Sequence, residues 1–204
     1  MPPPLRVAVL LSGSGRTLDN LLEAIAAGRL AARVEVVVSN KPGVRGLTIA
    51  ERAGVPTHIV PRGDLSLADW SGQIFDICRR GQADLVVMAG FLQLVEIPTE
   101  FADRVINIHP ALLPAFGGKG FHGMHVHRAV LARGCTVSGC TVHLVDNEYD
   151  HGHIVLQKTV PVLADDTADS LAARVFAAEC VALPEAINTF GSRLVSHVTR
   201  EAAS

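Results

Sequence analysis

An apolar run from Arg6 to Leu11 leads directly into a short loop of serine and glycine, residues 12–15. A strand that is apolar at successive positions is typical of one buried on both faces in a parallel sheet. Beyond the loop, Leu18, Leu21, Leu22 and Ile25 recur with helical spacing, and Gly28 closes the pattern. Strand, loop and helix in this order predict the first unit of a doubly wound α/β fold.

The same alternation continues through the first half of the chain. We predict further strands at 34–38, 57–60, 85–89 and 105–108, with helices to about residue 53 and over 67–80 and 126–132. Two longer strands, 137–145 and 153–162, then follow one another before a final helix from about Thr167 to Asn188. The expected fold is α/β: a Rossmann-like doubly wound mixed sheet, parallel in its N-terminal half, with an antiparallel C-terminal addition.

Length and composition restrict the class of protein. A chain of 204 residues with 49% hydrophobic and 19% charged residues fits a single domain with a substantial core. A formal net charge of −2 gives no electrostatic reason to expect a nucleic acid partner. The first residues do not resemble a signal peptide, and no apolar run is long enough to cross a bilayer. We therefore expect a cytoplasmic protein that binds no membrane.

The cysteines and histidines of the chain are candidate metal ligands. Three of the four cysteines lie in apolar or small-residue surroundings, which favours reduced core thiols. Cys135 and Cys140 could pair on adjacent strand positions, but their spacing matches no common zinc or redox motif. Seven of the nine histidines lie between residues 109 and 153. His125 and His127, like His151 and His153, are two residues apart, and residues with this spacing do not share a face of a helix, where we place the first pair. We expect no metal, with a zinc hydrolase as an alternative.

Residues 105–114 contain Asn-x-His followed by two prolines. Asn107 and His109 are two residues apart on a predicted strand, so both side chains point to the same face. Pro110 and Pro114 end the strand and stiffen the chain that leaves it. An amide beside an imidazole at a strand end suits a reaction that passes through an oxyanion. This pattern favours acyl or formyl transfer.

The loop that follows the first strand, Ser12-Gly-Ser-Gly-Arg-Thr17, leads into the first helix. Its glycines expose backbone N–H groups, and a helix N-terminus favours an anion. Arg16 adds a cation and Thr17 a hydroxyl group. The loop is neither a dinucleotide fingerprint nor a P-loop. It favours a phosphate monoester, although a tight turn that binds nothing has the same sequence.

Three of these motifs directly follow predicted strands: Ser12–Gly15, Gly90–Phe91 and Asn107–His109. Since ligands of such sheets bind beyond the carboxyl ends of the strands, we expect one shared cleft. Asp150 lies between the last two strands, where a carboxylate that reaches His109 would orient the imidazole. The alternative for Asp150 is a turn residue before Gly152.

Together these motifs resemble those of the glycinamide ribonucleotide formyltransferases, folate-dependent enzymes of purine synthesis. The resemblance covers nearly the whole chain and rests on residues 7–15, 38–41, 88–91, 106–114, 139–143 and 150–152. The pattern Asn-x-His-Pro-x-Leu-Leu-Pro is typical of the wider formyltransferase superfamily, and the phosphate loop narrows the match to this member.

The resemblance implies transfer of the formyl group of 10-formyltetrahydrofolate to the amine of glycinamide ribonucleotide during de novo IMP synthesis. Asn107 and His109 would stabilise the oxyanion, and Asp150 would orient the site and help to manage the proton. We further expect His109 to work as a cation beside Asp150. The substrate phosphate would bind Gly13, Ser14, Gly15, Arg16 and Thr17, and the ribose would bind Glu179. The folate would contact Phe91, Leu92, Leu94, Asp146, Asn147 and Glu148.

The implied organisation is a single domain over 1–204, with phosphate bound by about 1–100 and with folate binding and catalysis in about 101–204. The expected partners are the two small-molecule substrates, without nucleic acid or membrane, in a monomer or homodimer. The segment Phe116–Met124 is longer than in compact members of the family. We interpret it as a flexible glycine loop, with Lys119 reaching a phosphate or a folate tail as the alternative.

Other functions share part of this pattern. Formyltetrahydrofolate deformylase uses the same Asn, His and Asp residues to hydrolyse, but adds an N-terminal domain for which a first strand at Arg6 leaves no room. Methionyl-tRNA formyltransferase adds a C-terminal β-barrel for tRNA, and this chain has no basic surplus to bind RNA. A non-catalytic module that binds a nucleotide phosphate would need only the Ser12–Thr17 loop.

Overall fold

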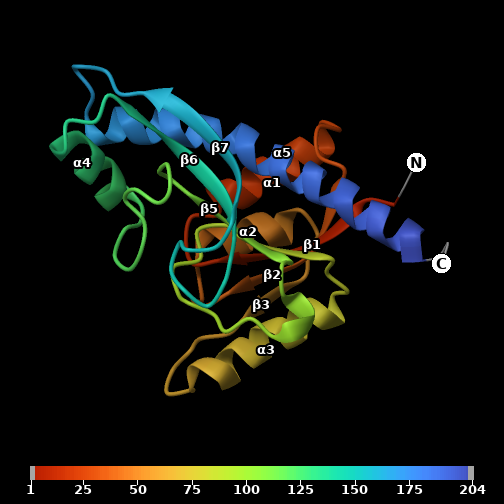
Figure 1. Cartoon of the computed structure of the whole chain (residues 1–204). Helices are drawn as coiled ribbons and strands as arrows, with labels where there is room; N and C mark the ends of the chain where they lie inside the picture. Colours follow the sequence, from red (N-terminus) through yellow and green to blue (C-terminus); the bar gives the residue numbers. More distant parts are fainter. Residues whose placement is uncertain (1–2, 202–204) are drawn as a thin grey trace.

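The computed structural model describes residues 3–201, and side chains up to residue 191. Its centre is a seven-stranded sheet in the order β3-β2-β1-β4-β5-β6-β7 (Figure 1). The strands are β1 (Leu5–Leu11), β2 (Ala32–Ser39), β3 (Thr57–Ile59), β4 (Leu85–Met88), β5 (Val105–His109), β6 (Val137–Leu144) and β7 (Ile154–Pro161). The first five strands pair in parallel, whereas β5–β6 and β6–β7 pair antiparallel. The predicted mixed sheet is confirmed.

Helices cover both faces of the sheet. They are α1 (Arg16–Ala26), α2 (Arg45–Arg52), α3 (Leu67–Arg80), α4 (Met124–Ala132) and α5 (Ala168–Glu201), with a short 3-10 helix η1 (Thr99–Phe101). Figure 1 shows α3 on one side of the sheet and α1 and α5 on the other. Of these described helices, none is both long and apolar enough to cross a membrane.

One sequence-based expectation about helices was wrong, and one short helix was missed. The last helix does not end near Asn188 but continues to Glu201, because Gly191 lowers helix propensity without ending the helix. The 3-10 helix η1 was not predicted, since a three-residue turn leaves no periodic pattern in the sequence.

The core forms two layers because successive residues of a strand point to opposite faces. Val7, Val9 and Leu11 of β1 pack with α1 and α5, whereas Ala8 and Leu10 pack with α3. This two-sided burial explains the continuous apolar run at the start of the chain.

The strand order reverses between β1 and β4. The connection through α1 places β2 on one side of β1, and the connection through α3 places β4 on the other side. The polar residues that follow β1, β4 and β5 therefore meet at one edge of the sheet. That edge carries the cleft described next.

Candidate active site

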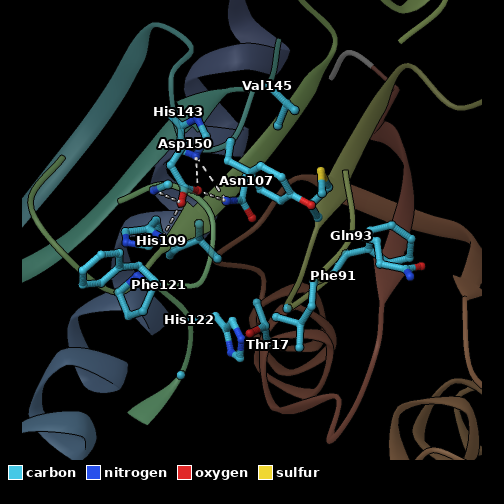
Figure 2. Close-up of a pocket in the computed structure, with 18 of the residues that line it drawn as sticks. Thr17, Phe91, Gln93, Asn107, His109, Phe121, His122, His143, Val145 and Asp150 are labelled. Carbon is cyan, nitrogen blue, oxygen red and sulfur yellow. Dashed lines mark hydrogen bonds and ion pairs between the residues drawn. The ribbon is translucent and has the colours of Figure 1, made fainter. Parts of the chain in front are cut away.

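A cleft of about 640 Å³ lies beyond the carboxyl ends of β4 and β5. Its wall combines the start of α1, the segment after β4, the end of β5, the loops at 118–123 and 148–150, and one side of α5. Figure 2 shows the labelled side chains of Asn107, His109, His143 and Asp150 converging at one end of this cleft. Of the three strand-end motifs predicted to share one cleft, Gly90–Phe91 and Asn107–His109 line it, whereas Ser12–Gly15 does not.

The pairing of β5 with β6 places two polar residues opposite each other. Asn107 is the register partner of His143, and His109 is the partner of Thr141. Asn107 and His109 both line the cleft, as their two-residue spacing predicts. Cross-strand partners have adjacent side chains, so β6 brings a second imidazole to the site.

Asp150 reaches this group from the loop between β6 and β7. Its Oδ2 lies 3.4 Å from Nδ1 of His109, and its Oδ1 lies 3.4 Å from Nδ2 of Asn107. Oδ1 also lies 3.6 Å from Nε2 of His143. The predicted trio is therefore brought together, with His143 as a fourth member.

Hydrogen bonds to backbone carbonyls define which ring nitrogens carry hydrogen. Nδ1 of His143 lies 2.7 Å from the carbonyl of Leu144, and a carbonyl can only accept. Nε2 of His143 is then the acceptor for Nδ2 of Asn107, at 3.1 Å. This contact orients the amide of Asn107 and leaves its second N–H for Asp150 or a ligand.

His109 is only 4% exposed, and burial lowers the pKa of its imidazole despite the opposing effects of Asp150 and of the Phe116 carbonyl. The ring is therefore mainly neutral at pH 7. Nε2 donates to the carbonyl of Phe116 at 2.8 Å, so Nδ1 presents its lone pair toward Asp150. Burial penalises the charged ring and so favours a neutral His109 at rest, whereas the expected cation beside Asp150 stays a prediction for the working enzyme.

Asp150 stays ionised in the same surroundings. Burial would raise the pKa of its carboxyl group, but contacts with His143, His109 and the Gly118 N–H together lower it. A neutral imidazole thus faces a carboxylate at 3.4 Å, and a single proton delivered to Nδ1 would form an ion pair between them. The His109–Asp150 pair can therefore accept a proton at Nδ1 of His109.

The loop predicted to hold a phosphate is a tight turn between β1 and α1. Gly15 has φ 72° and its Cα faces Gly46 of α2 so closely that an added Cβ would meet the Gly46 Cα at 2.4 Å. Arg16 and Thr17, the first residues of α1, line the cleft. Gly13, Ser14 and Gly15 precede them in the turn and are not among the residues that line the cleft.

Glu179 of α5 faces the same end of the cleft as Arg16. Burial raises the pKa of its carboxyl group to about 7, and the charge of Arg16 opposes this rise. The Arg16 guanidinium lies 3.7 Å from the centre of the Phe176 ring, also on α5. Helix α5 thus places both an aromatic face and a carboxyl group beside the start of α1.

Four of the six residues predicted to contact folate line the cleft: Phe91, Leu92, Leu94 and Glu148. Asp146 and Asn147 do not line it and instead shape the loop after β6. The Asp146 carboxylate accepts hydrogen bonds from the Glu148 N–H and His151, and Asn147 accepts one from the Ile97 N–H.

The structure places several cleft residues that the sequence did not single out. His143 lies in one of the family-like motifs but was not predicted as a site residue, although a position opposite Asn107 in an antiparallel pair could have indicated its role. His127 of α4 is buried and its Nδ1 has no hydrogen-bond partner. The glycine-rich segment also contributes Gly118, Lys119, Gly120, Phe121, His122 and Gly123 to the wall.

Within residues 3–201, no cluster of three or more histidine, cysteine or acidic side chains could hold a metal ion. The four cysteines are free, and burial raises the pKa of both the Cys78 and the Cys140 thiols to about 12. These two thiols are therefore protonated and poor nucleophiles at neutral pH.

Residues 5–187 match the model of one family, described as formyl transferase. The chain belongs to the formyl transferase family. A crystal structure of glycinamide ribonucleotide transformylase 1 from Symbiobacterium toebii is similar to this chain, with a TM-score of 0.86 and 39% identity. That match covers 94% of this chain and 90% of the other.

A chloroplastic phosphoribosylglycinamide formyltransferase of Vigna unguiculata is 44% identical over 177 residues, which is 83% of this chain. The chain spans 55% of the length of that relative. A formyltetrahydrofolate deformylase from Pseudomonas syringae shares the fold at a TM-score of 0.78 and 26% identity, and this chain covers 60% of it.

Proposed function

We propose that the protein transfers a formyl group from 10-formyltetrahydrofolate to the amine of glycinamide ribonucleotide. The observation that carries this proposal is the convergence of Asn107, His109 and Asp150 at one end of a cleft whose other wall is the start of α1. The family match and the similarity to a glycinamide ribonucleotide transformylase support it.

The cleft offers suitable surroundings for both substrates. Arg16 and Thr17 combine the first-turn N–H groups of a helix with a cation and a hydroxyl group, which suits a phosphate. Phe91, Leu92 and Leu94 form an apolar wall that suits a planar ring. The N-terminal half, about 1–100, would hold the phosphate, and residues about 101–204 would supply catalysis and most of the remaining folate wall.

In the reaction, the amine nitrogen attacks the formyl carbon, and the carbonyl electrons move to oxygen. The second N–H of Asn107 lies 3.4 Å from Oδ1 of Asp150 in the structure and would donate to that oxyanion instead, a contact worth about 3 kcal/mol of barrier in comparable sites. The nitrogen of the amine must then lose a proton, and the leaving folate nitrogen must gain one. The His109–Asp150 pair accepts the first proton and returns it for the second step, so the overall transfer is balanced.

The pair also explains why no covalent nucleophile is needed. Holding the amine against the formyl carbon removes much of the entropic barrier to their reaction. His143 fixes the Asn107 amide, while Asp150 keeps its charge beside His109. Each of the four polar residues therefore has a task in one proton-coupled addition and elimination.

The first experiment mixes the protein with 10-formyltetrahydrofolate, with and without glycinamide ribonucleotide, and follows the folate absorbance. We expect folate turnover that depends on the ribonucleotide. Asn107→Ala should lower kcat about 100- to 1000-fold, since it removes the oxyanion donor.

Equal folate loss with and without the acceptor would instead indicate the deformylase reaction. Binding of the ribonucleotide without any folate turnover would favour a non-catalytic phosphate-binding module. Gly72→Ala, in α3 and remote from the cleft, is a matched control because an added Cβ at Gly72 meets no atom within 4 Å.

A further inference from the structure

The glycine loop, defined as residues 116–123, joins the strand-end prolines to α4 and forms one wall of the cleft. It was expected to be flexible. Its first residues, however, make backbone hydrogen bonds to both members of the catalytic pair. The carbonyl of Phe116 accepts from Nε2 of His109 at 2.8 Å, and the N–H of Gly118 donates to Oδ2 of Asp150 at 2.9 Å.

We propose that the glycine loop is a positioning element that sets the proton distribution of the His109–Asp150 pair through two backbone groups, the Phe116 carbonyl and the Gly118 N–H. This inference rests on the proposed function, because it concerns how the same pair handles its proton. It adds a role for a segment whose side chains need not touch the substrate.

The two hydrogen bonds act on different atoms of the pair. The Phe116 carbonyl can only accept, so it keeps the hydrogen of a neutral His109 on Nε2 and leaves Nδ1 toward Asp150. The Gly118 N–H can only donate, so it favours the ionised form of Asp150. The loop therefore holds a base on one side and a carboxylate on the other.

The backbone of the loop is shaped for these contacts. Phe116 has φ 55° and Gly118 has φ 92°, so both lie in the left-handed region, which non-glycine residues seldom occupy. A positive φ at a bulky residue costs free energy and is often found where a backbone group serves a site. The loop has four residues with positive φ, and two of them, Phe116 and Gly118, supply the groups that bind the pair.

Gly117, between them, sets the distance from the loop to Asp150. A Cβ added at Gly117 would lie 2.5 Å from Cδ2 of Leu113 and 3.2 Å from Cβ of Asp150. Gly117 has no positive φ, so substitution there tests space rather than backbone strain. A side chain at this position would push the loop away from Asp150.

The titratable groups that face the His109–Asp150 pair are histidines. Asp150 is faced by His109 from β5 and His143 from β6, and His109 is faced in addition by His127 from α4. Loss of the Gly118 N–H would remove one contact that keeps the pKa of Asp150 low. The acid limb of the rate profile should then move to higher pH, because a carboxylate that lacks this donor favours uptake of a proton by the His109–Asp150 pair as pH falls.

The test compares Gly117→Ala and Gly117→Val with Gly72→Ala over a range of pH. We expect the Gly117 variants to lose kcat by about 10-fold or more, with the acid limb about half a pH unit or more higher. The KM for the ribonucleotide should stay within about threefold, since the start of α1 is unchanged. A loss confined to KM, or an unshifted pH profile, would overturn the proposal.

A second measurement needs neither substrate nor a Gly117 variant. In the unsubstituted protein, the Gly118 amide proton should change its NMR chemical shift with the titration of Asp150, and Asp150→Asn should abolish that change. A Gly118 amide chemical shift that stays constant while Asp150 titrates would refute the positioning role. A failed formyl transfer with an intact Gly118 titration would count against the proposed function only.

Discussion

Glu179 is a carboxyl group on the cleft wall that is costly to ionise. Burial raises its pKa to about 7, from an ordinary value of 4.5. The charge of Arg16 offsets only part of this cost, because the effect of burial is the larger one. Above pH 4.5 the unfolded chain releases this proton, whereas the folded protein retains it up to about pH 7.

Replacing Glu179 should therefore stabilise the protein in a pH-dependent way. For Glu179→Gln, we expect a thermal unfolding midpoint close to that of the unsubstituted protein at pH 5 and clearly above it at pH 8. The reason is that ionisation of a group with a raised pKa weakens the fold as pH rises from 4.5 to about 7.

Glu51→Gln serves as the control, because Glu51 is an exposed carboxylate on α2. Its effect on the midpoint should not change between pH 5 and pH 8. A Glu179→Gln variant with the same constant offset at both pH values would contradict the raised pKa.

At the scale of elements, α5 is fastened to the rest of the fold by polar contacts as well as by its apolar face. Pro184 lies inside this helix and has no N–H for the carbonyl of Cys180, four residues earlier. The side chain of Asn20 on α1 donates to that carbonyl at 3.2 Å. The Cys180 carbonyl, which Pro184 leaves without a partner N–H within α5, thus accepts a hydrogen bond from α1.

A double-mutant cycle measures this contact. Asn20→Ala should lower the free energy of unfolding by about 1 kcal/mol, because it leaves the Cys180 carbonyl without its partner. In a Pro184→Ala background the restored backbone N–H can serve this carbonyl, so the cost of Asn20→Ala should fall to less than half. Urea unfolding of the four proteins provides the values.

Glu23→Ala is the comparison for the same helix, since Glu23 is an exposed residue of α1. Its effect should be the same with proline or alanine at position 184. Equal costs for Asn20→Ala in the two backgrounds would show that the Cys180 carbonyl does not depend on Asn20.

At the scale of the whole molecule, the two layers of the core share the same strands. One layer contains the helices α1, α4 and α5, and the other contains α3 with Trp70 at its centre. Trp70 is fully buried and its indole N–H donates to the carbonyl of Val60 at 2.8 Å. Because the same strands are covered on both faces, their unfolding would expose the apolar side chains of both layers.

Unfolding should therefore be cooperative over the whole sheet. Trp70 is the only tryptophan in the sequence, so its fluorescence reports on the α3 layer alone, whereas far-ultraviolet circular dichroism reports on all helices. We expect both signals to give the same urea midpoint. A fluorescence transition at clearly lower urea would mean that the α3 layer unfolds separately.

The regular elements were largely predictable because their signals are local. The apolar run to Leu11, the helical face that contains Trp70 and the alternation of strands with helices all depend on residues close in sequence. The extension of α5 beyond Asn188 was missed because one unfavourable glycine is a weak local signal that the rest of a helix can outweigh.

The amino-acid sequence by itself determined the fold class, the strand end that carries Asn107 and His109, and the family that these motifs resemble. Only the tertiary structure decided what surrounds them. The antiparallel register brought His143 opposite Asn107, and burial made the His109 ring neutral. The backbone of the glycine loop reached both members of the pair. Register, burial and backbone contacts arise between segments far apart in the chain, so no local pattern records them.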